Sequence, residues 1–298
     1  MIAGPALLFC PGDRPERFAK AMERADSVII DLEDAVAPAD KPAAREALIA
    51  NPLDPERVIV RVNPSTSEFH AADLAALAQT RYRRVMLPKA EHPSDLDGLD
   101  ELGGGGGFGG PVGLDRDGGP GGGGGLGGLE VIALCETPVG VRDVDALAAD
   151  PRVVALTWGA EDLVAAIGGF ASRTPDGRFS EVARYARSRV LIAAAAAGKP
   201  AYDTVHPALA DDDGLREEAS EAAAAGFRGA MCLHPRQVPV IREAYQPDEV
   251  ALAWSAGVLA AARTAGSGVF AYNGQMIDEP LLRQARRIAE AGGVGVPA

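Results

Sequence analysis

The stretch VVALTWGAEDL occupies residues 153–163 and changes character in its middle. Its first six residues are apolar or β-branched without polar alternation, which is typical of a strand buried on both faces. Acidic residues follow only after this run has ended, as Glu161 and Asp162 just beyond Gly159. The pattern therefore predicts a buried strand of a parallel sheet whose carboxyl end carries carboxylates.

Seven similar runs occur elsewhere in the chain. They are ALLF (6–9), VIIDL (28–32), VIVRV (58–62), VML (85–87), VIAL (131–134), AYDTV (201–205) and GAMCL (229–233). Helical signals separate most of them, at Arg14–Arg24, Lys41–Ile49, Phe179–Ala197 and Leu215–Ala225. Eight strands alternating with helices predict an α/β fold, a (βα)8 TIM barrel over residues 1–235. The doubly wound alternative usually has G-x-G-x-x-G after its first strand, where this chain has CPGDR.

Two segments fall outside the barrel pattern. Residues 103–128 contain 17 glycines in 26 positions, which predicts a disordered loop between a helix and the fifth strand, on the face away from the chemistry. A glycine-rich phosphate cradle is the alternative, but no Lys-Ser/Thr pair follows. Residues 236–298 are expected to form a C-terminal extension of two or three helices around 270–278. We expect this extension to contribute to an oligomer contact and to the active site.

Charge and composition exclude several classes of protein. The net charge of −13 argues against nucleic-acid binding, which needs clustered basic residues. Three scattered cysteines do not make a disulfide framework or a zinc site. No run approaches the roughly 20 apolar residues of a membrane span, and the first residues lack the basic region of a secretory signal. We therefore expect a cytoplasmic protein that binds neither nucleic acid nor membrane.

Carboxylates dominate the predicted carboxyl ends of the strands, where barrel enzymes hold their active sites. The polar residues at these ends are Asp31, Glu33, Asp34, Arg61, Lys89, Glu91, Glu136, Glu161, Asp162, Asp203, His206 and His234. Oxygen donors without a His or Cys cluster favour Mg²⁺ over zinc, and one or two carboxylates suffice for it. Glu136 and Asp162 follow adjacent strands and are candidates for one shared ion. The alternative is that each carboxylate caps a helix or pairs with a nearby arginine.

Eight sequence blocks resemble the successive signatures of the citrate lyase β-subunit-like family, which includes malyl-CoA and citramalyl-CoA lyases. The blocks are LFCPGDRPERFAKA, VIIDLEDAVAPADKPAAREAL, VIVRVN, VMLPKAE, CETPVG, WGAEDL, GFRGAMCLHPRQ and GQMIDEPLL. They occur in family order along nearly the whole chain. Two features depart from the family pattern, namely Thr137-Pro138 after Glu136 and the glycine-rich insertion.

The resemblance implies a Mg²⁺-dependent TIM barrel that assembles as a homotrimer or a multiple of it. It implies Glu136 and Asp162 as metal ligands and Arg61 as the residue that grips the substrate. Asp278 would be an acid or base lent by a neighbouring subunit. Arg14 and Lys89, together with Glu136, are also expected at the substrate.

Glu33 and Asp34 have a supporting role in this interpretation. We expect them to order metal-bound waters or to hold Arg61 and Lys89 in place. A structural role is expected for His234, while the role of His206 stays open. The three cysteines are expected to be small core residues, because no base lies beside any of them in the sequence.

The expected reaction is cleavage of a carbon–carbon bond in a β-hydroxyacyl-CoA, giving an acyl-CoA and a keto acid. Citramalyl-CoA, malyl-CoA and hydroxymethylglutaryl-CoA are the candidate substrates. Two other enzymatic readings stay open. One is the β subunit of a citrate lyase complex, acting on a citryl group bound to a carrier protein. The other is a class II aldolase acting on free hydroxy-keto acids, and a non-enzymatic scaffold is a third, weaker class.

Overall fold

The computed structural model describes residues 2–99, 128–265 and 268–293. Its main feature is one parallel eight-stranded sheet with the order β7-β6-β5-β4-β3-β2-β1-β8. The strands are β1 (Ala6–Pro11), β2 (Ser27–Asp31), β3 (Val58–Arg61), β4 (Arg84–Leu87), β5 (Glu130–Cys135), β6 (Val153–Trp158), β7 (Ala201–Tyr202) and β8 (Ala230–Cys232). The two ends of this order meet where Asp203 pairs in parallel with Ala230. The sheet is therefore closed into a barrel, and all eight predicted strands are confirmed.

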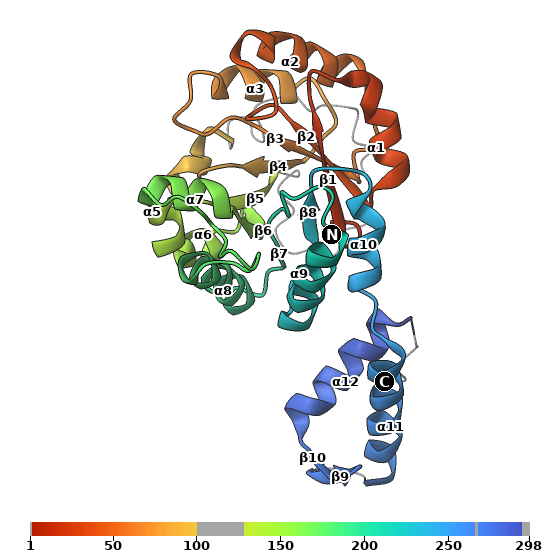
Figure 1. Ribbon diagram of the computed structural model, residues 1–298. Helices are drawn as coiled ribbons and strands as arrows, with labels where there is room; N and C mark the ends of the chain where they lie inside the picture. Colours follow the sequence, from red (N-terminus) through yellow and green to blue (C-terminus); the bar gives the residue numbers. More distant parts are fainter. Residues whose placement is uncertain (1, 100–127, 266–267, 294–298) are drawn as a thin grey trace, which may run out of the picture. The chain divides into compact units, whose positions relative to one another are not determined.

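Helices follow the strands and surround the sheet on its outer side (Figure 1). They are α1 (Phe18–Arg24), α2 (Lys41–Ala50), α3 (His70–Leu77), α5 (Pro138–Arg142), α6 (Val144–Ala149), α7 (Ala160–Ile167), α8 (Glu181–Ala196), α9 (Asp212–Ala225) and α10 (Gln237–Ala244). Short 3₁₀ turns at Pro15–Arg17, Pro38–Asp40 and Pro93–Leu96 complete the connections. The expected (βα)8 TIM barrel is thus the observed fold.

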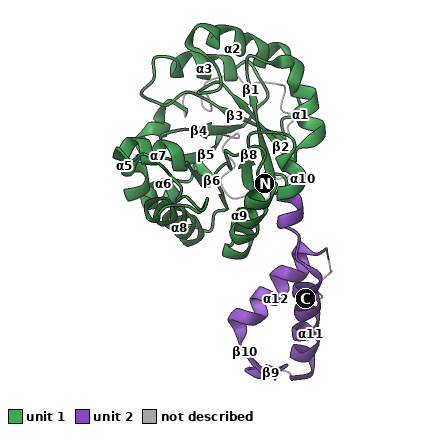
Figure 2. Cartoon of the chain, viewed as in Figure 1, with its two compact units in different colours: residues 1–241 green, residues 242–298 purple. Residues whose placement is uncertain are grey.

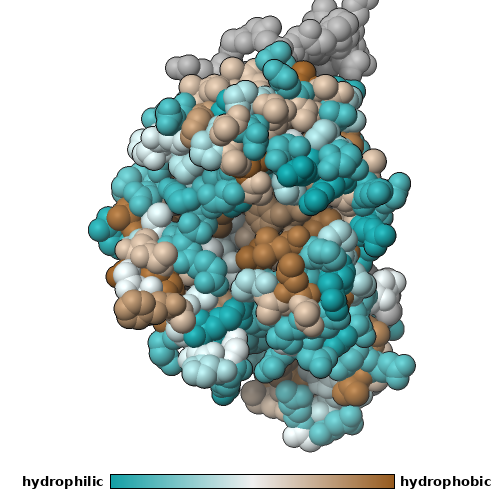
Figure 3. Space-filling model, turned by 45° about the horizontal axis from the view of Figure 1, so that its top comes forward, coloured by the Kyte–Doolittle hydropathy of each residue, from teal (hydrophilic) through white to brown (hydrophobic). Residues whose placement is uncertain are grey.

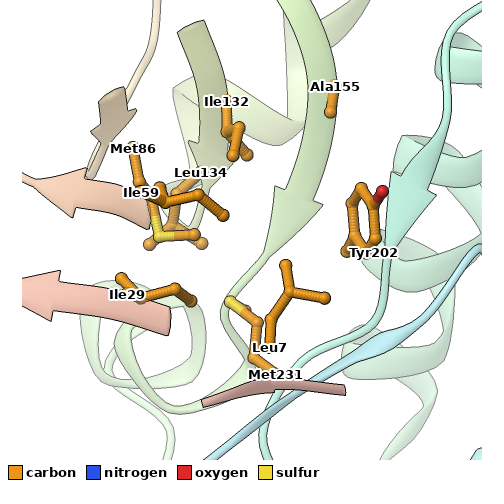
Figure 4. Close-up of a cluster of buried hydrophobic side chains, with 9 residues drawn as sticks. All are labelled: Leu7, Ile29, Ile59, Met86, Ile132, Leu134, Ala155, Tyr202 and Met231. Carbon is orange, nitrogen blue, oxygen red and sulfur yellow. The ribbon is translucent and has the colours of Figure 1, made fainter. Parts of the chain in front are cut away.

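The barrel interior is filled by apolar side chains from all eight strands (Figure 4). They are Leu7, Ile29, Ile59, Met86, Ile132, Leu134, Ala155, Tyr202 and Met231. Uninterrupted apolar runs are needed because the same strands also bury their outer faces against helices. Fully burying one such aliphatic side chain contributes roughly 1.5–3 kcal/mol. This packed interior fixes the strand ends, which carry the polar residues.

The three cysteines are buried and free of disulfides. Burial raises the pKa of Cys10 to about 11 and that of Cys135 to about 12. Both thiols are therefore protonated at neutral pH, which suits core residues and not nucleophiles.

The described surface is mixed in polarity. Figure 3 shows hydrophobic residues near the centre of one face, with hydrophilic residues around them. Among the helices that the structure describes, none is long and apolar enough to cross a membrane. The expected glycine-rich loop at 103–128 lies, apart from Gly128, outside the described residues.

The chain divides into two compact units, residues 1–241 and 242–298 (Figure 2). The division falls inside α10, whose buried Val238 and Ile241 belong to the barrel unit. The second unit contains α11 (Glu249–Ala265) and α12 (Glu279–Ala291), so the expected C-terminal helices are present. Between them lies a β-hairpin of β9 (Phe270–Tyr272) and β10 (Gln275–Ile277) that we did not foresee.

The hairpin has a local cause in the sequence. Asn273 and Gly274 both have positive φ, 48° and 78°. An Asn-Gly pair at these angles matches the right-handed twist of two short strands. The same unit has its own small apolar core around Val258, Ile277 and Ala285.

Candidate active site

Arg61 and Asp31 form the first fixed pair at the carboxyl end of the barrel. They stand side by side because β2 and β3 pair Asp31 with Arg61. Arg61 donates from Nε to Asp31 Oδ1 at 2.7 Å and from Nη2 to Oδ2 at 2.5 Å. Burial lowers the pKa of Arg61, but Asp31 and Glu33 outweigh it and hold that pKa above its usual value. The guanidinium lies 4.8 Å from the centre of the Phe9 ring, so it is held in one orientation.

Glu33 joins this pair to a lysine. Its carboxylate lies 3.0 Å from Arg61 Nη1 and accepts a 2.6 Å hydrogen bond from Lys89 Nζ. Its backbone is fixed by Lys41, whose buried Nζ donates to the carbonyls of Leu32 at 2.8 Å and Glu33 at 2.9 Å. Burial raises the pKa of Glu33, and the two cations oppose that rise. Glu33 therefore holds both Arg61 and Lys89 at this end of the barrel.

Glu136 follows β5 and is only 3% exposed. Its Oε1 accepts a 3.2 Å hydrogen bond from the Lys89 backbone N–H. Oε2 lies against Gly159, where an added Cβ would be only 2.5 Å away. Burial raises the pKa of Glu136 to about 8, and the nearby charges of Asp162 and Glu33 add to this. The structure therefore holds a buried carboxylate among other carboxylates with little cationic compensation.

Asp162 approaches the same place from the first turn of α7. Its Oδ1 lies 3.6 Å from Lys89 Nζ, which is also 4.0 Å from Glu136 Oε1. The neighbouring Glu161 instead accepts a 2.6 Å hydrogen bond from Ser172. Two of the predicted carboxylates, Glu136 and Asp162, thus converge on one ammonium position.

The charges at this site favour one divalent cation. Ion pairs between side chains join four carboxylates to Arg61 and Lys89, so two negative charges are in excess among these six side chains when all are ionised. The atoms available here as metal ligands are carboxylate oxygens, which suit Mg²⁺ and not zinc. Among the described residues, no group of three or more His, Cys, Asp or Glu is arranged to hold a metal. Glu136 and Asp162 fit a Mg²⁺ ion that keeps most positions for water and substrate.

Three other predicted residues each have a different local environment. Asp34 is exposed and acts on Lys89 only through its charge. Arg14 is also exposed, and its Nε lies 3.6 Å from Asp13. Asp278 belongs to the C-terminal unit, where it caps α12 by accepting a 3.3 Å hydrogen bond from Leu281 N.

Asp203 is a rim carboxylate with a different environment. It is 3% exposed and accepts from Arg187 Nη2 at 2.8 Å and from Trp158 Nε1 at 2.7 Å. Arg187 Nε and the Thr204 backbone N–H also donate to it. Every side of this carboxylate has a donor, so Asp203 joins strands and helices together instead of facing a ligand.

The two histidines at the rim are also in structural positions. His206 is buried, and its Nδ1 lies 2.9 Å from Glu218 Oε2. Arg173 pairs with the same Glu218. His234 is exposed, and its Nδ1 accepts from Arg236 N at 3.2 Å. Neither ring shares a described contact with the carboxylate network.

The departure at Thr137 has a structural role. Thr137 Oγ1 caps α5 by accepting from Gly140 N at 3.0 Å and donates to Glu91 at 2.7 Å. Gly140 is required because an added Cβ would lie 2.4 Å from the Ala90 carbonyl. Thr137 therefore fixes the start of helix α5, which follows Glu136. It also engages the Glu91 carboxylate in a hydrogen bond.

Sequence reasoning gave no role to two residues that shape the site. Asp31 holds one edge of Arg61, and Gly159 makes room for Glu136. Asp31 could have been found from its place opposite Arg61 on the adjacent strand. Recognising that place requires the register between the two strands. Gly159 could have been found from its position between a strand end and Asp162, where a backbone without Cβ permits close approach.

The sequence matches one protein family and several known relatives. The model of the family HpcH/HpaI aldolase/citrate lyase matches residues 6–235. A citrate lyase subunit beta-like protein of Mycobacterium tuberculosis is 48% identical over 291 residues, covering 98% of this chain and 96% of the relative. The mitochondrial citramalyl-CoA lyase of Homo sapiens is 31% identical over 301 residues, covering 94% of this chain and 83% of the relative.

A solved structure shows the same similarity in three dimensions. It is the crystal structure of the protein CitE from Mycobacterium tuberculosis in complex with magnesium, acetoacetate and coenzyme A. It matches with a TM-score of 0.86 and 47% sequence identity, and the match covers 98% of each chain. By sequence and by fold, this chain belongs to the HpcH/HpaI aldolase/citrate lyase family.

Proposed function

We propose that the protein is a Mg²⁺-dependent carbon–carbon lyase that cleaves a β-hydroxyacyl-CoA into an acyl-CoA and a keto acid. The observation that carries the proposal is the excess of carboxylate at the rim, where Glu136 and Asp162 converge beside Arg61. Relatives named as a citramalyl-CoA lyase and as a structure with magnesium, acetoacetate and coenzyme A support it. Mg²⁺ bound by Glu136 and Asp162 would supply a Lewis acid at the substrate oxygens.

We propose that Arg61 binds the substrate carboxylate. Asp31 already takes its Nε–Nη2 edge, so the guanidinium offers a substrate only its remaining N–H groups. Because Asp31, Glu33 and Phe9 fix the side chain, little entropy is lost when a substrate binds. Lys89 and Arg14 are proposed as further basic contacts for the substrate.

Asp278 is the proposed acid. In the cleavage direction the β-hydroxyl gives its proton to solvent water, its O–H electron pair forms the carbonyl of the keto acid, and the Cα–Cβ bond breaks. Its electron pair passes to the thioester enolate, and Asp278 protonates the enolate carbon to give the acyl-CoA. We further propose that the chain forms a homotrimer, or a multiple of it, in which Asp278 serves the barrel of a neighbouring subunit. This would explain why the chain has a second compact unit in addition to a barrel that is already closed.

The activity is tested with a panel of thioesters. Malyl-CoA, citramalyl-CoA and hydroxymethylglutaryl-CoA are incubated with purified protein and Mg²⁺, and keto-acid release is followed. Cleavage of at least one CoA ester, with no cleavage of the corresponding free acids, is expected. Cleavage of free hydroxy-keto acids alone would favour the class II aldolase, and activity only on a citryl carrier protein would favour the citrate lyase subunit.

The role of Asp278 is tested by subunit complementation. Asn is a good helix cap, so Asp278→Asn removes the acid while α12 keeps its N-cap. Asp278→Asn and Glu136→Gln should each be inactive, whereas mixed oligomers of the two should regain activity. Glu279→Gln, at the neighbouring exposed carboxylate, is the control and should remain active. Mixed oligomers without activity would contradict the sharing of Asp278 between subunits.

A further inference from the structure

Lys89 has a backbone conformation that is unusual for a lysine. Its φ is +53°, and among the described residues only Asn273 is another non-glycine with positive φ. This conformation is unfavourable for a lysine and persists only where the surroundings enforce it. Here Glu136 accepts the Lys89 N–H at 3.2 Å, and the next carbonyl, of Ala90, packs against Gly140. The fold therefore fixes the base of this side chain.

The Lys89 ammonium lies among three carboxylates from separate parts of the barrel. Its Nζ is 2.6 Å from Glu33 Oε1, 3.6 Å from Asp162 Oδ1 and 4.0 Å from Glu136 Oε1. A lysine ammonium is ordinarily charged at neutral pH, and this one lies at the place where the two proposed metal ligands converge.

We infer that Lys89 is a resident cation that competes with Mg²⁺ for Glu136 and Asp162. Without metal, the ammonium offsets the repulsion between the two carboxylates. Because the ion must compete with this charge, Lys89 also lowers the affinity of the two carboxylates for Mg²⁺. Its contact with Glu33 is the closest of the three, so Glu33 keeps the ammonium at the site when the other two contacts are lost. This inference rests on the proposed metal ligands, and it makes Lys89 a positioning residue as well as a substrate contact.

The physical reason is the mutual exclusion of two cations. A divalent ion held by Glu136 and Asp162 would use the two carboxylates that now lie 4.0 Å and 3.6 Å from Lys89 Nζ. Because like charges repel, the ion and the ammonium cannot both stay close to these two carboxylates without weakening each other's binding. The Lys89 side chain is one-third exposed, so it has room to turn away while it keeps Glu33.

The test measures Mg²⁺ binding by isothermal titration calorimetry at pH 8.5 on metal-free protein. Lys89→Met and Lys89→Gln should each bind Mg²⁺ about tenfold more tightly than the unchanged protein, because the competing charge is gone. Both should also unfold at a lower temperature without metal, and the gain in melting temperature on adding Mg²⁺ should be larger. Lys89→Arg keeps the charge and should bind with nearly unchanged affinity.

Lys199→Met is the matched control. Lys199 lies before β7, at the opposite end of the barrel, and its Nζ donates to the Asp150 carbonyl. The substitution changes the net charge by the same amount and should leave Mg²⁺ affinity unchanged.

Two failures are distinguishable in this experiment. If the unchanged protein binds Mg²⁺ and both neutral variants bind it with equal or weaker affinity, the competing role of Lys89 is refuted while the metal site stands. Tighter binding in Lys89→Arg would also refute it. If the unchanged protein and all variants fail to bind Mg²⁺, the proposed metal ligands themselves are wrong.

Discussion

Glu136 and Asp203 are both buried carboxylates that directly follow barrel strands, yet their surroundings differ. Each is 3% exposed, and burial is the leading cause that raises the pKa of each. Asp203 is surrounded by donors from Arg187, Trp158 and the backbone. Glu136 has one backbone N–H at 3.2 Å and an ammonium 4.0 Å away. Burial alone therefore does not distinguish the two carboxylates, whereas the donors that compensate their charge do.

Substitution of Glu136 should produce the largest effect. Glu136→Gln removes a proposed metal ligand while it keeps the side-chain shape. Because a bound metal contributes several kcal/mol to transition-state stabilisation, keto-acid release should fall about 1000-fold. Steady-state kinetics at saturating Mg²⁺ measures this. Turnover equal to that of the unchanged protein would refute the metal assignment.

Substitution of Asp203 should affect stability and not metal binding. Asp203→Asn takes from the buried Arg187 its buried carboxylate partner and leaves it only the more exposed Glu221, which costs about 3 kcal/mol of unfolding free energy. Urea denaturation measures the loss, and titration of the folded variant with Mg²⁺ should give an unchanged dissociation constant. A variant of normal stability that no longer binds Mg²⁺ would reverse the roles given to the two carboxylates.

Gly159→Ala tests how closely the backbone must approach Glu136. The added Cβ would lie 2.5 Å from Oε2, so the carboxylate must move, and Mg²⁺ should bind more weakly by about tenfold. Gly98→Ala is the control, because its Cβ would meet its nearest neighbour at an ordinary 3.7 Å. Calorimetric titration compares the two, and equal affinities would show that Glu136 tolerates displacement.

The pH dependence of Mg²⁺ binding should be the mildest effect. The pKa of Glu136 is raised to about 8 in the metal-free protein, so below pH 8 a proton competes with the ion. Apparent affinity should therefore rise with pH by up to about tenfold per unit as far as pH 8 and then level off. Titrations in two buffers of different ionisation enthalpy would detect the released proton. Constant affinity between pH 7 and 8, without proton release, would contradict this.

Much of the barrel could be predicted because each strand is an uninterrupted apolar run, as in residues 153–158. The convergence of Glu136 and Asp162 could also be expected, since the carboxyl ends of parallel strands meet at one rim. The pairing of Asp31 with Arg61 could not, because it depends on the register between β2 and β3. The positive φ of Lys89 is likewise invisible in the sequence, since neighbouring groups impose it on a residue that does not favour it.

Titration of metal-free protein with Mg²⁺ tests the central claim most directly. The unchanged protein and Asp203→Asn should each bind one Mg²⁺ per chain, and Glu136→Gln should bind none at the same concentrations. That result would show that the uncompensated carboxylate, and not the compensated one, forms the metal site. Equal binding by the unchanged protein and Glu136→Gln, or no binding by the unchanged protein, would contradict the account.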